Sequence, residues 1–159
     1  MRRTVMSCLV AALVLAACAS VNPDGLKPGA SLSEITQQMG EPRATYPLAN
    51  GGKRLEFRGS GPLTFMLDVD ASGKLVQSVQ VLNETNFRNI VAGMTREQVL
   101  ATLGKPDNVA PGGRQGGEVW SYNFRNTQCQ WFQVAIGADG RTSSGGSTNL
   151  REACMNAGD

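Results

Sequence analysis

The residues that could carry out chemistry in this 159-residue chain are few, and they exclude the common hydrolase designs. The sequence contains no histidine, so neither a Ser-His-Asp triad nor a Cys-His pair can be built. Asp68 and Asp70 could form a pair of carboxylates, but Asp is also frequent in hairpin turns because its side chain bonds to nearby backbone N–H groups. We interpret this pair as structural. The sequence therefore predicts a protein without enzyme activity and without a cofactor.

Two glycine-rich stretches invite comparison with phosphate-binding loops. They are NGG at 50–52 and PGGRQGG at 111–117. Neither lies between a predicted strand and a predicted helix, and neither ends in the Lys-Ser or Lys-Thr of a P-loop. We interpret both as hairpin or connecting loops.

The remaining reactive side chains are cysteines at positions 8, 18, 129 and 154. We expect Cys129 and Cys154 to form a disulfide, because the N-terminal segment described below indicates export to an oxidising compartment. Closing a loop of about 25 residues contributes roughly 3 kcal/mol in the chain-entropy model. A reduced pair is the alternative. A zinc site would be short of ligands, since only these two thiols remain after export and there is no histidine.

The N-terminal segment has the organisation of an exported lipoprotein. Arg2 and Arg3 precede an apolar stretch, TVMSCLVAALVLAA, that is too short to span a bilayer as a stable helix. The run LAAC at 15–18 resembles the bacterial lipobox, which implies cleavage before Cys18 and attachment of acyl chains such as palmitate to that residue. By resemblance to enterobacterial sorting rules, Ala19 favours the outer membrane over the inner one. The alternative is an ordinary signal peptide whose cysteine is incidental.

The charge of the chain gives no indication of a nucleic-acid partner. It has 15 lysine and arginine residues against 13 acidic ones, and the two counts become equal once Arg2 and Arg3 leave with the signal peptide. No basic stretch suited to nucleic acid remains. We expect instead a membrane contact through the lipid anchor and a protein partner in the envelope, with no bound metal.

An internal repeat organises the rest of the chain. GASLSEITQQMGEP begins at Gly29 and GMTREQVLATLGKP begins at Gly93. In each copy a Ser or Thr precedes a Glu or Gln by three residues, the pattern of a helix capping box. Two apolar residues spaced by four follow, and Gly then Pro end the helix, so two helices of about ten residues are predicted. The residues concerned are Ser31, Glu34, Ile35, Met39 and Gly40 in the first copy and Thr95, Gln98, Val99, Leu103 and Gly104 in the second.

Alternating apolar residues after each predicted helix indicate strands. In the first half we expect strands around 55–57, 63–69 and 75–82. In the second half we expect strands around 120–124 and 131–136, with a weak third strand after Arg141. DASGK and ADGR, which precede the last strand of each half, predict tight hairpins. The predicted fold class is α+β, a tandem repeat of a short helix packed on a three-stranded antiparallel sheet.

These motifs resemble those of a known family. NFRNIVAGMTREQVLATLGKPDNV, followed by EVWSYNF, resembles the SmpA/OmlA (BamE-like) family of outer-membrane lipoproteins, and GASLSEITQQMGEP followed by KRLEFR resembles it more loosely. The resemblance implies a non-enzymatic role in outer-membrane protein assembly or envelope integrity, with the barrel-assembly complex as a candidate partner. The chain departs from the family in having two copies and a C-terminal cysteine pair. β-Lactamase inhibitory proteins have a similar tandem fold, so a periplasmic inhibitor or ligand-binding module is the alternative.

The expected organisation has five parts. They are a signal peptide at 1–17, a lipidated tether at 18–28, a first BamE-like repeat at 29–83, a second at 84–141, and a polar tail with the disulfide at 142–159. TSSGGSTN at 142–149 has almost no apolar content with which to hold itself.

Partner-binding residues are expected in two equivalent loops, 43–52 and 107–117, and among the aromatic residues of the strands. Long loops on a rigid scaffold often carry recognition, although glycine-driven mobility is the simpler alternative. Aromatic residues dominate interface hot spots. At alternating strand positions they are more often core, and we assign Tyr122 and Phe132 there. The expected contact residues are Tyr46, Asn50, Arg114, Trp120 and Trp131.

Overall fold

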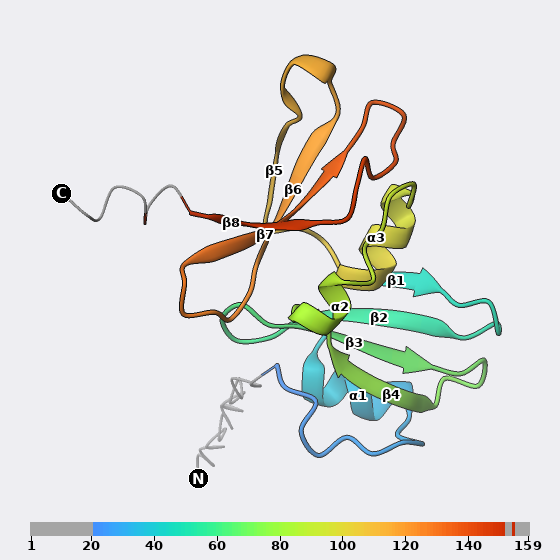
Figure 1. The fold of residues 1–159 in the computed structure, drawn as a ribbon. Coiled ribbons are helices and arrows are strands. Elements are labelled where there is room, and N and C mark those ends of the chain that lie inside the picture. The colour runs from blue at the N-terminus through green and yellow to red at the C-terminus, as the bar shows by residue number, and fades with distance from the viewer. Residues whose placement is uncertain (1–20, 152–153, 155–159) are drawn as a thin grey trace, which may run out of the picture.

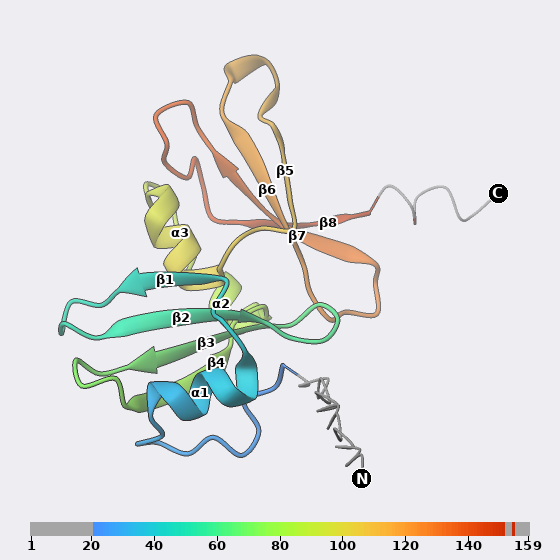
Figure 2. The same ribbon diagram turned by 180° about the vertical axis from the view of Figure 1, so that it is seen from behind.

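A computed structural model describes residues 21–151 and Cys154 of the protein, and it contains two four-stranded antiparallel sheets with an eight-residue helix ahead of each (Figures 1 and 2). The predicted signal peptide and the predicted lipidation site, Cys18, lie outside the described residues. In the described part, no helix is both long and apolar enough to cross a bilayer.

The first half of the chain forms helix α1 (Leu32–Met39) and a sheet of order β1-β2-β3-β4. Its strands are β1 (Ala44–Pro47), β2 (Lys53–Arg58), β3 (Thr64–Val69) and β4 (Leu75–Gln80).

The second half begins with the short helix α2 (Glu84–Phe87), followed by α3 (Arg96–Leu103) and a sheet of order β5-β6-β7-β8. Its strands are β5 (Asn108–Pro111), β6 (Glu118–Asn123), β7 (Gln130–Ile136) and β8 (Ser147–Leu150). A single 3-10 turn, η1 (Gly113–Gln115), joins β5 to β6.

Helices α1 and α3 begin as the repeat predicts. The N–H of Glu34 donates to Ser31 Oγ at 3.3 Å, and the Glu34 carboxylate accepts the N–H of Ser31 at 2.7 Å. Thr95 and Gln98 form the same reciprocal pair at the start of α3. Each helix ends at a glycine with positive φ, a conformation that other residues rarely adopt. The capping prediction is confirmed, and the helices are shorter than the ten residues expected.

The sheets have four strands each, whereas the sequence predicted three. β1 and β5 lie in segments 43–52 and 107–117, which we expected to be loops. Each is four residues long and ends in proline, so no alternating apolar run marks it. β8 lies in the segment expected to be a weakly structured polar tail. All four of its side chains are exposed, and it is held by pairing with β7 rather than by apolar burial.

Two apolar clusters hold the layers together. The first packs Ile35 and Met39 of α1 against one face of the first sheet. The second joins Val99 and Leu103 of α3 to the second sheet and also contains Met66 of β3. Helix α3 therefore lies between the two sheets and connects them into one body (Figure 1).

The segment before α1 is packed against the body of the protein. Val21 and Leu26 contact the first apolar cluster. Gln38 of α1 donates to the backbone oxygens of Asn22 and Asp24 at 2.9 and 2.7 Å. The part of the expected tether that the structure describes, residues 21–28, is therefore packed on the body.

Candidate functional site

A groove of about 1200 Å³ lies where the two halves of the chain meet. One wall contains Gln80, Leu82, Asn83, Glu84, Phe87 and Arg88, from the end of β4 and the α2 segment. The other wall contains residues 124–128, in the turn between β6 and β7, and residues 146–148 at the start of β8. Leu63, in the turn between β2 and β3, also lines the groove. The groove thus collects side chains from segments that are far apart in the sequence.

The floor of the groove is a cluster of three phenylalanines. The Phe87 ring stacks on Phe132 with 3.9 Å between centroids, and its edge meets Phe124 at 5.0 Å. All three are at least 94% buried, since their exposed fractions are 6%, 3% and 6%. Gly146 lies directly on this floor, because a Cβ atom there would stand 2.0 Å from Phe132 Cζ. Aromatic packing therefore fixes the shape of the floor.

The wall formed by α2 is fixed by an asparagine cap. Asn83 Oδ1 accepts the N–H of Asn86 at 3.0 Å, which starts the helix, and Asn83 Nδ2 donates to Gln80 O at 2.7 Å. This double contact joins the end of β4 to α2. The exposed Arg88 at the end of the helix then lines the groove.

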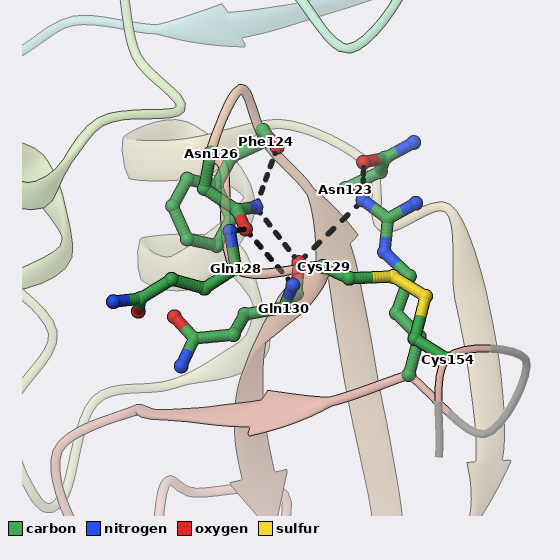
Figure 3. The surroundings of a disulfide bond; sticks show 8 residues. Asn123, Phe124, Asn126, Gln128, Cys129, Gln130 and Cys154 are labelled. Atoms are coloured by element: carbon green, nitrogen blue, oxygen red, sulfur yellow. Dashed lines mark hydrogen bonds between the residues drawn. A yellow bond between two sulfur atoms is a disulfide. The ribbon is translucent and has the colours of Figure 1, made fainter. Parts of the chain in front are cut away.

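The opposite wall is fixed by a second asparagine and by the disulfide (Figure 3). Asn126 Nδ2 donates to the backbone oxygens of Phe124 and Gln130, and its Oδ1 accepts the N–H groups of Gln128 and Gln130. Cys129, in the same turn, adopts φ +54° and is disulfide-bonded to Cys154, with 6.4 Å between their Cα atoms. One side chain and one covalent bond therefore hold this turn in place.

The groove offers hydrogen-bonding groups rather than a catalytic constellation. Its polar side chains are amides and hydroxyls, and its charged side chains are Glu84, Arg88 and Arg125. Neither arginine forms an ion pair within the described residues. The described part also contains no cluster of three side chains that would suit a metal ion. Such a lining, with an aromatic floor, is suited to recognition of another molecule.

Residues 80–131 match one family model. Its description is "Outer membrane protein assembly factor BamE domain". The match confirms the resemblance for the second half of the chain and covers a single domain, which is α+β as expected. No curated protein sequence matches the chain. A solved structure, a cysteine-rich secretory protein from Staphylococcus aureus subsp. aureus Mu50, is 12% identical over 87% of this chain with a TM-score of 0.30, and the chain spans 50% of that protein's length. At that score the similarity carries no argument.

The BamE match coincides with the groove. It begins at the last residue of β4 and ends at the second residue of β7. The whole α2 wall and the whole β6–β7 turn are inside it, whereas Leu63, Phe132 and the β8 residues are outside. Most of the groove is therefore built from the segment that is recognisable as a BamE domain.

The five predicted contact residues do not come together in this groove. Asn50 lies in the β1–β2 turn, and Arg114 is exposed in η1, at the tip between β5 and β6. Trp131 is half-buried on β7, where the Arg151 guanidinium lies 4.8 Å from its ring centroid. The other two, Tyr46 and Trp120, have structural contacts.

Trp120 is buried and Tyr46 is half-buried, and both side chains have partners within the protein. Trp120 is 6% exposed, and its indole N–H donates to Glu118 at 2.9 Å. The Tyr46 hydroxyl donates to the Glu56 carboxylate at 2.6 Å. Burial, and then this bond to a carboxylate, raise the pKa of Tyr46 above its ordinary value. Tyr122 and Phe132 are core residues, as expected.

Asp68 and Asp70 have separate structural roles, as predicted. Asp68 accepts two hydrogen bonds from Arg54, at 2.6 and 2.8 Å, and one from Gln77 at 2.7 Å. Asp70 accepts the N–H groups of Ser72 and Lys74 in the β3–β4 hairpin. Both carboxylates are therefore engaged in holding the first sheet.

The groove residues were missed because their sequence signals are short. Asn83 before Glu84 is an N-cap signal, and Asn126 in the polar run RNTQ is a turn signal. Each could have been found locally. Their position across a shared groove depends on the packing of α2 against the second sheet, which no local pattern encodes.

Proposed function

We propose that this protein is a non-enzymatic lipoprotein of the outer membrane, facing the periplasm, that binds a protein partner in outer-membrane protein assembly or envelope integrity. The observation that carries the proposal is the coincidence of the BamE match with the groove walls. A fixed hollow with an aromatic floor, lined by two arginines that form no ion pair within the described residues, suits such recognition.

The proposal includes two tandem BamE-like units. Supporting it, each eight-residue helix has the same capping box and is followed by a four-stranded sheet. In each half, the cap residue also forms an isolated bridge to the last residue of the hairpin turn, Ser31 to Lys74 and Thr95 to Arg141. The two halves thus share their local geometry as well as their sequence pattern.

The proposal also includes anchoring through lipidated Cys18. Supporting it, Val21 already packs against the body. Only Cys18, Ala19 and Ser20 would separate the lipid from Val21, and three residues span about 10 Å at most. The body would then be held close to the membrane, with α1 and the segment at 21–28 nearest to it.

The test is affinity capture of tagged, full-length protein from crosslinked and solubilised membranes, with Cys18→Ser as a comparison. A groove variant with Arg88→Glu and Arg125→Glu is compared with Arg114→Glu, an exposed arginine in η1 outside the groove. We expect barrel-assembly proteins to be enriched with the wild type and with Arg114→Glu, and to be depleted with the groove variant and with Cys18→Ser. A different dominant partner, captured equally by all four forms, would contradict the proposal and favour an inhibitor or adaptor.

A further inference from the structure

Three of the four sheet edges are interrupted by proline or by other parts of the chain. Hydrogen-bonding direction alternates along an antiparallel strand, and the N–H of Leu48 donates to Gly52 O, so Pro47 faces away from β2. Proline has no N–H to donate to an added strand, which leaves Thr45 as the β1 residue with an outward N–H. On β5 the N–H of Gly112 donates to Gly117 O, so Pro111 faces outward in the same way and leaves Val109 as the residue with an outward N–H.

The edge of β4 is partly covered by other parts of the chain. Its first residue, Leu75, exchanges hydrogen bonds with Gly29 and Ala30 at 2.7 and 2.8 Å. Its last residue, Gln80, accepts the Asn83 side chain on its backbone oxygen at 2.7 Å. Contacts therefore occupy both ends of this edge, and the part of β4 between them remains open.

The edge of β8 is open. The N–H of Arg151 donates to Cys129 O at 3.0 Å, which shows that Arg151 faces β7. Hydrogen-bonding direction alternates along an antiparallel strand. Thr148 and Leu150 therefore direct their N–H and C=O groups away from β7, and within the described residues none of these four groups has a hydrogen-bond partner. Residues 142–150 contain no charged side chain and no proline that would discourage pairing.

Three contacts hold this open edge in place although its own side chains bury little. The disulfide between Cys129 and Cys154 joins its far end to the β6–β7 turn (Figure 3). Arg151 lies over the Trp131 ring, and Asn149 Nδ2 donates to Gln133 Oε1 at 2.8 Å. The backbone groups of Thr148 and Leu150 are thus presented by a fixed strand, which lowers the entropic cost of binding.

The open edge borders the groove. Thr148 pairs with Phe132 across the sheet, so its side chain lies on the same face as the aromatic floor, and both residues line the hollow. A strand added beside β8 would border the groove, with alternate side chains on the face of the sheet that Thr148 shares with Phe132. Ser147 adjoins Thr148 and Gln130 pairs with Leu150, so the polar side chains at this edge are uncharged and fit an uncharged segment. The charged lining residues Glu84, Arg88 and Arg125 belong to the α2 segment and the β6–β7 turn.

We propose that β8 receives an extended, uncharged segment of a protein partner as a fifth strand of the second sheet. Main-chain hydrogen bonds to Thr148 and Leu150 provide affinity, and the face that Thr148 shares with Phe132 receives every second side chain of the added strand. This inference rests on the proposed partner-binding function and names its mode.

The test uses a short peptide of alternating threonine and valine residues, acetylated and amidated at its ends, and the disulfide-bonded protein. Amide hydrogen exchange is followed by NMR. Peptide binding is expected to slow the exchange of the Thr148 and Leu150 amides and to leave that of Val109, on the β5 edge, unchanged. Failure of the Thr148 and Leu150 amides to slow at millimolar peptide would overturn the proposal, and this measurement needs no variant.

Matched proline variants provide the second measurement. Thr148→Pro removes an N–H that points away from β7 and should weaken peptide binding about tenfold, the loss of one main-chain hydrogen bond. Val109→Pro removes an edge N–H from β5 and should not weaken it. Equal effects of the two would overturn the proposal. If the peptide binds at β8 but assembly proteins are not captured, only the proposed function is refuted. If assembly proteins are captured by wild type and by Thr148→Pro alike, and the peptide does not bind, only strand addition is refuted.

Discussion

The carboxylate of Glu56 accepts the backbone N–H of Lys105 with both of its oxygens, each at 3.1 Å. Glu56 is on β2 of the first half and is fully buried, while Lys105 follows the last turn of α3 in the second half. The Tyr46 hydroxyl donates to the same carboxylate at 2.6 Å, and Arg43 lies 3.7 Å away. A helix C-terminus ordinarily presents carbonyl groups, which cannot donate to a carboxylate. The Glu56 carboxylate instead binds the N–H of Lys105, just beyond α3, and this charge-assisted bond fixes how the two halves meet.

Replacement of Glu56 by alanine should destabilise the junction. The change leaves the Lys105 N–H and the Tyr46 hydroxyl without their acceptor inside the protein and creates a cavity, for which we expect a loss of about 3–5 kcal/mol in the free energy of unfolding. Urea denaturation followed by tryptophan fluorescence measures it. Glu41→Ala, at an exposed position, is the control. A loss below about 1 kcal/mol for Glu56→Ala would mean that the two halves do not depend on this contact.

The two helix-terminating glycines provide a matched pair for the same junction. Both have positive φ, +78° at Gly40 and +84° at Gly104. A Cβ atom at Gly40 would meet nothing within 4 Å, whereas one at Gly104 would stand 2.9 Å from the Glu56 carboxyl carbon. Gly40→Ala should cost about 1–3 kcal/mol from backbone strain alone, since φ +78° with ψ −160° is a conformation essentially restricted to glycine, and Gly104→Ala should cost clearly more. Equal unfolding free energies for the two variants would show that the approach of α3 to β2 is loose.

The pH dependence of stability should reveal the Asp68–Arg54 pair. Burial alone would raise the pKa of Asp68, but hydrogen bonds from Arg54 and Gln77 and the charge of Arg54 hold this pKa below its ordinary value. A depressed folded-state pKa contributes stability that is complete above the unfolded-state pKa of about 4 and is lost as the pH falls through the folded-state value. Wild type should therefore exceed Asp68→Asn in stability at pH 7, and the difference should shrink below about pH 4. A difference that stays constant down to pH 2 would exclude this origin.

Local features of the fold could be predicted from the sequence, and features set by distant contacts could not. Ser31 and Thr95 predicted the starts of the two helices, because a capping box lies within four residues. Asp70 and its neighbours predicted the β3–β4 hairpin in the same local way. The third strand expected after Arg141 had only a weak local signal, and β8 forms there because pairing with β7 and a disulfide across 25 residues hold it.

The candidate site shows the same division. Glu56 occupies an alternating position that a single helix and sheet would leave exposed, and only the arrival of α3 buries it. Trp120 was expected to contact a partner because aromatic residues dominate interfaces, but α3 covers the inner face of its sheet. The groove depends on α2 packing through Phe87 on Phe132, which lie on separate elements. None of these three contacts is encoded in a short window.

Loss of the disulfide should release β8 before the rest of the protein. In the chain-entropy model, removing a crosslink that closes about 25 residues costs roughly 3 kcal/mol. Because all four β8 side chains are exposed, no apolar burial replaces the disulfide, and pairing with β7 and a few polar contacts remain. In Cys154→Ser, amide exchange of Asn149 should therefore accelerate strongly, while that of Ile35, buried beneath α1, should change only with global stability. Hydrogen exchange followed by mass spectrometry or NMR measures both, and chemical reduction of the wild type should reproduce the variant. Equal acceleration at the two amides would mean that β8 unfolds only with the whole protein, and that the disulfide stabilises the fold globally rather than holding the edge beside the groove.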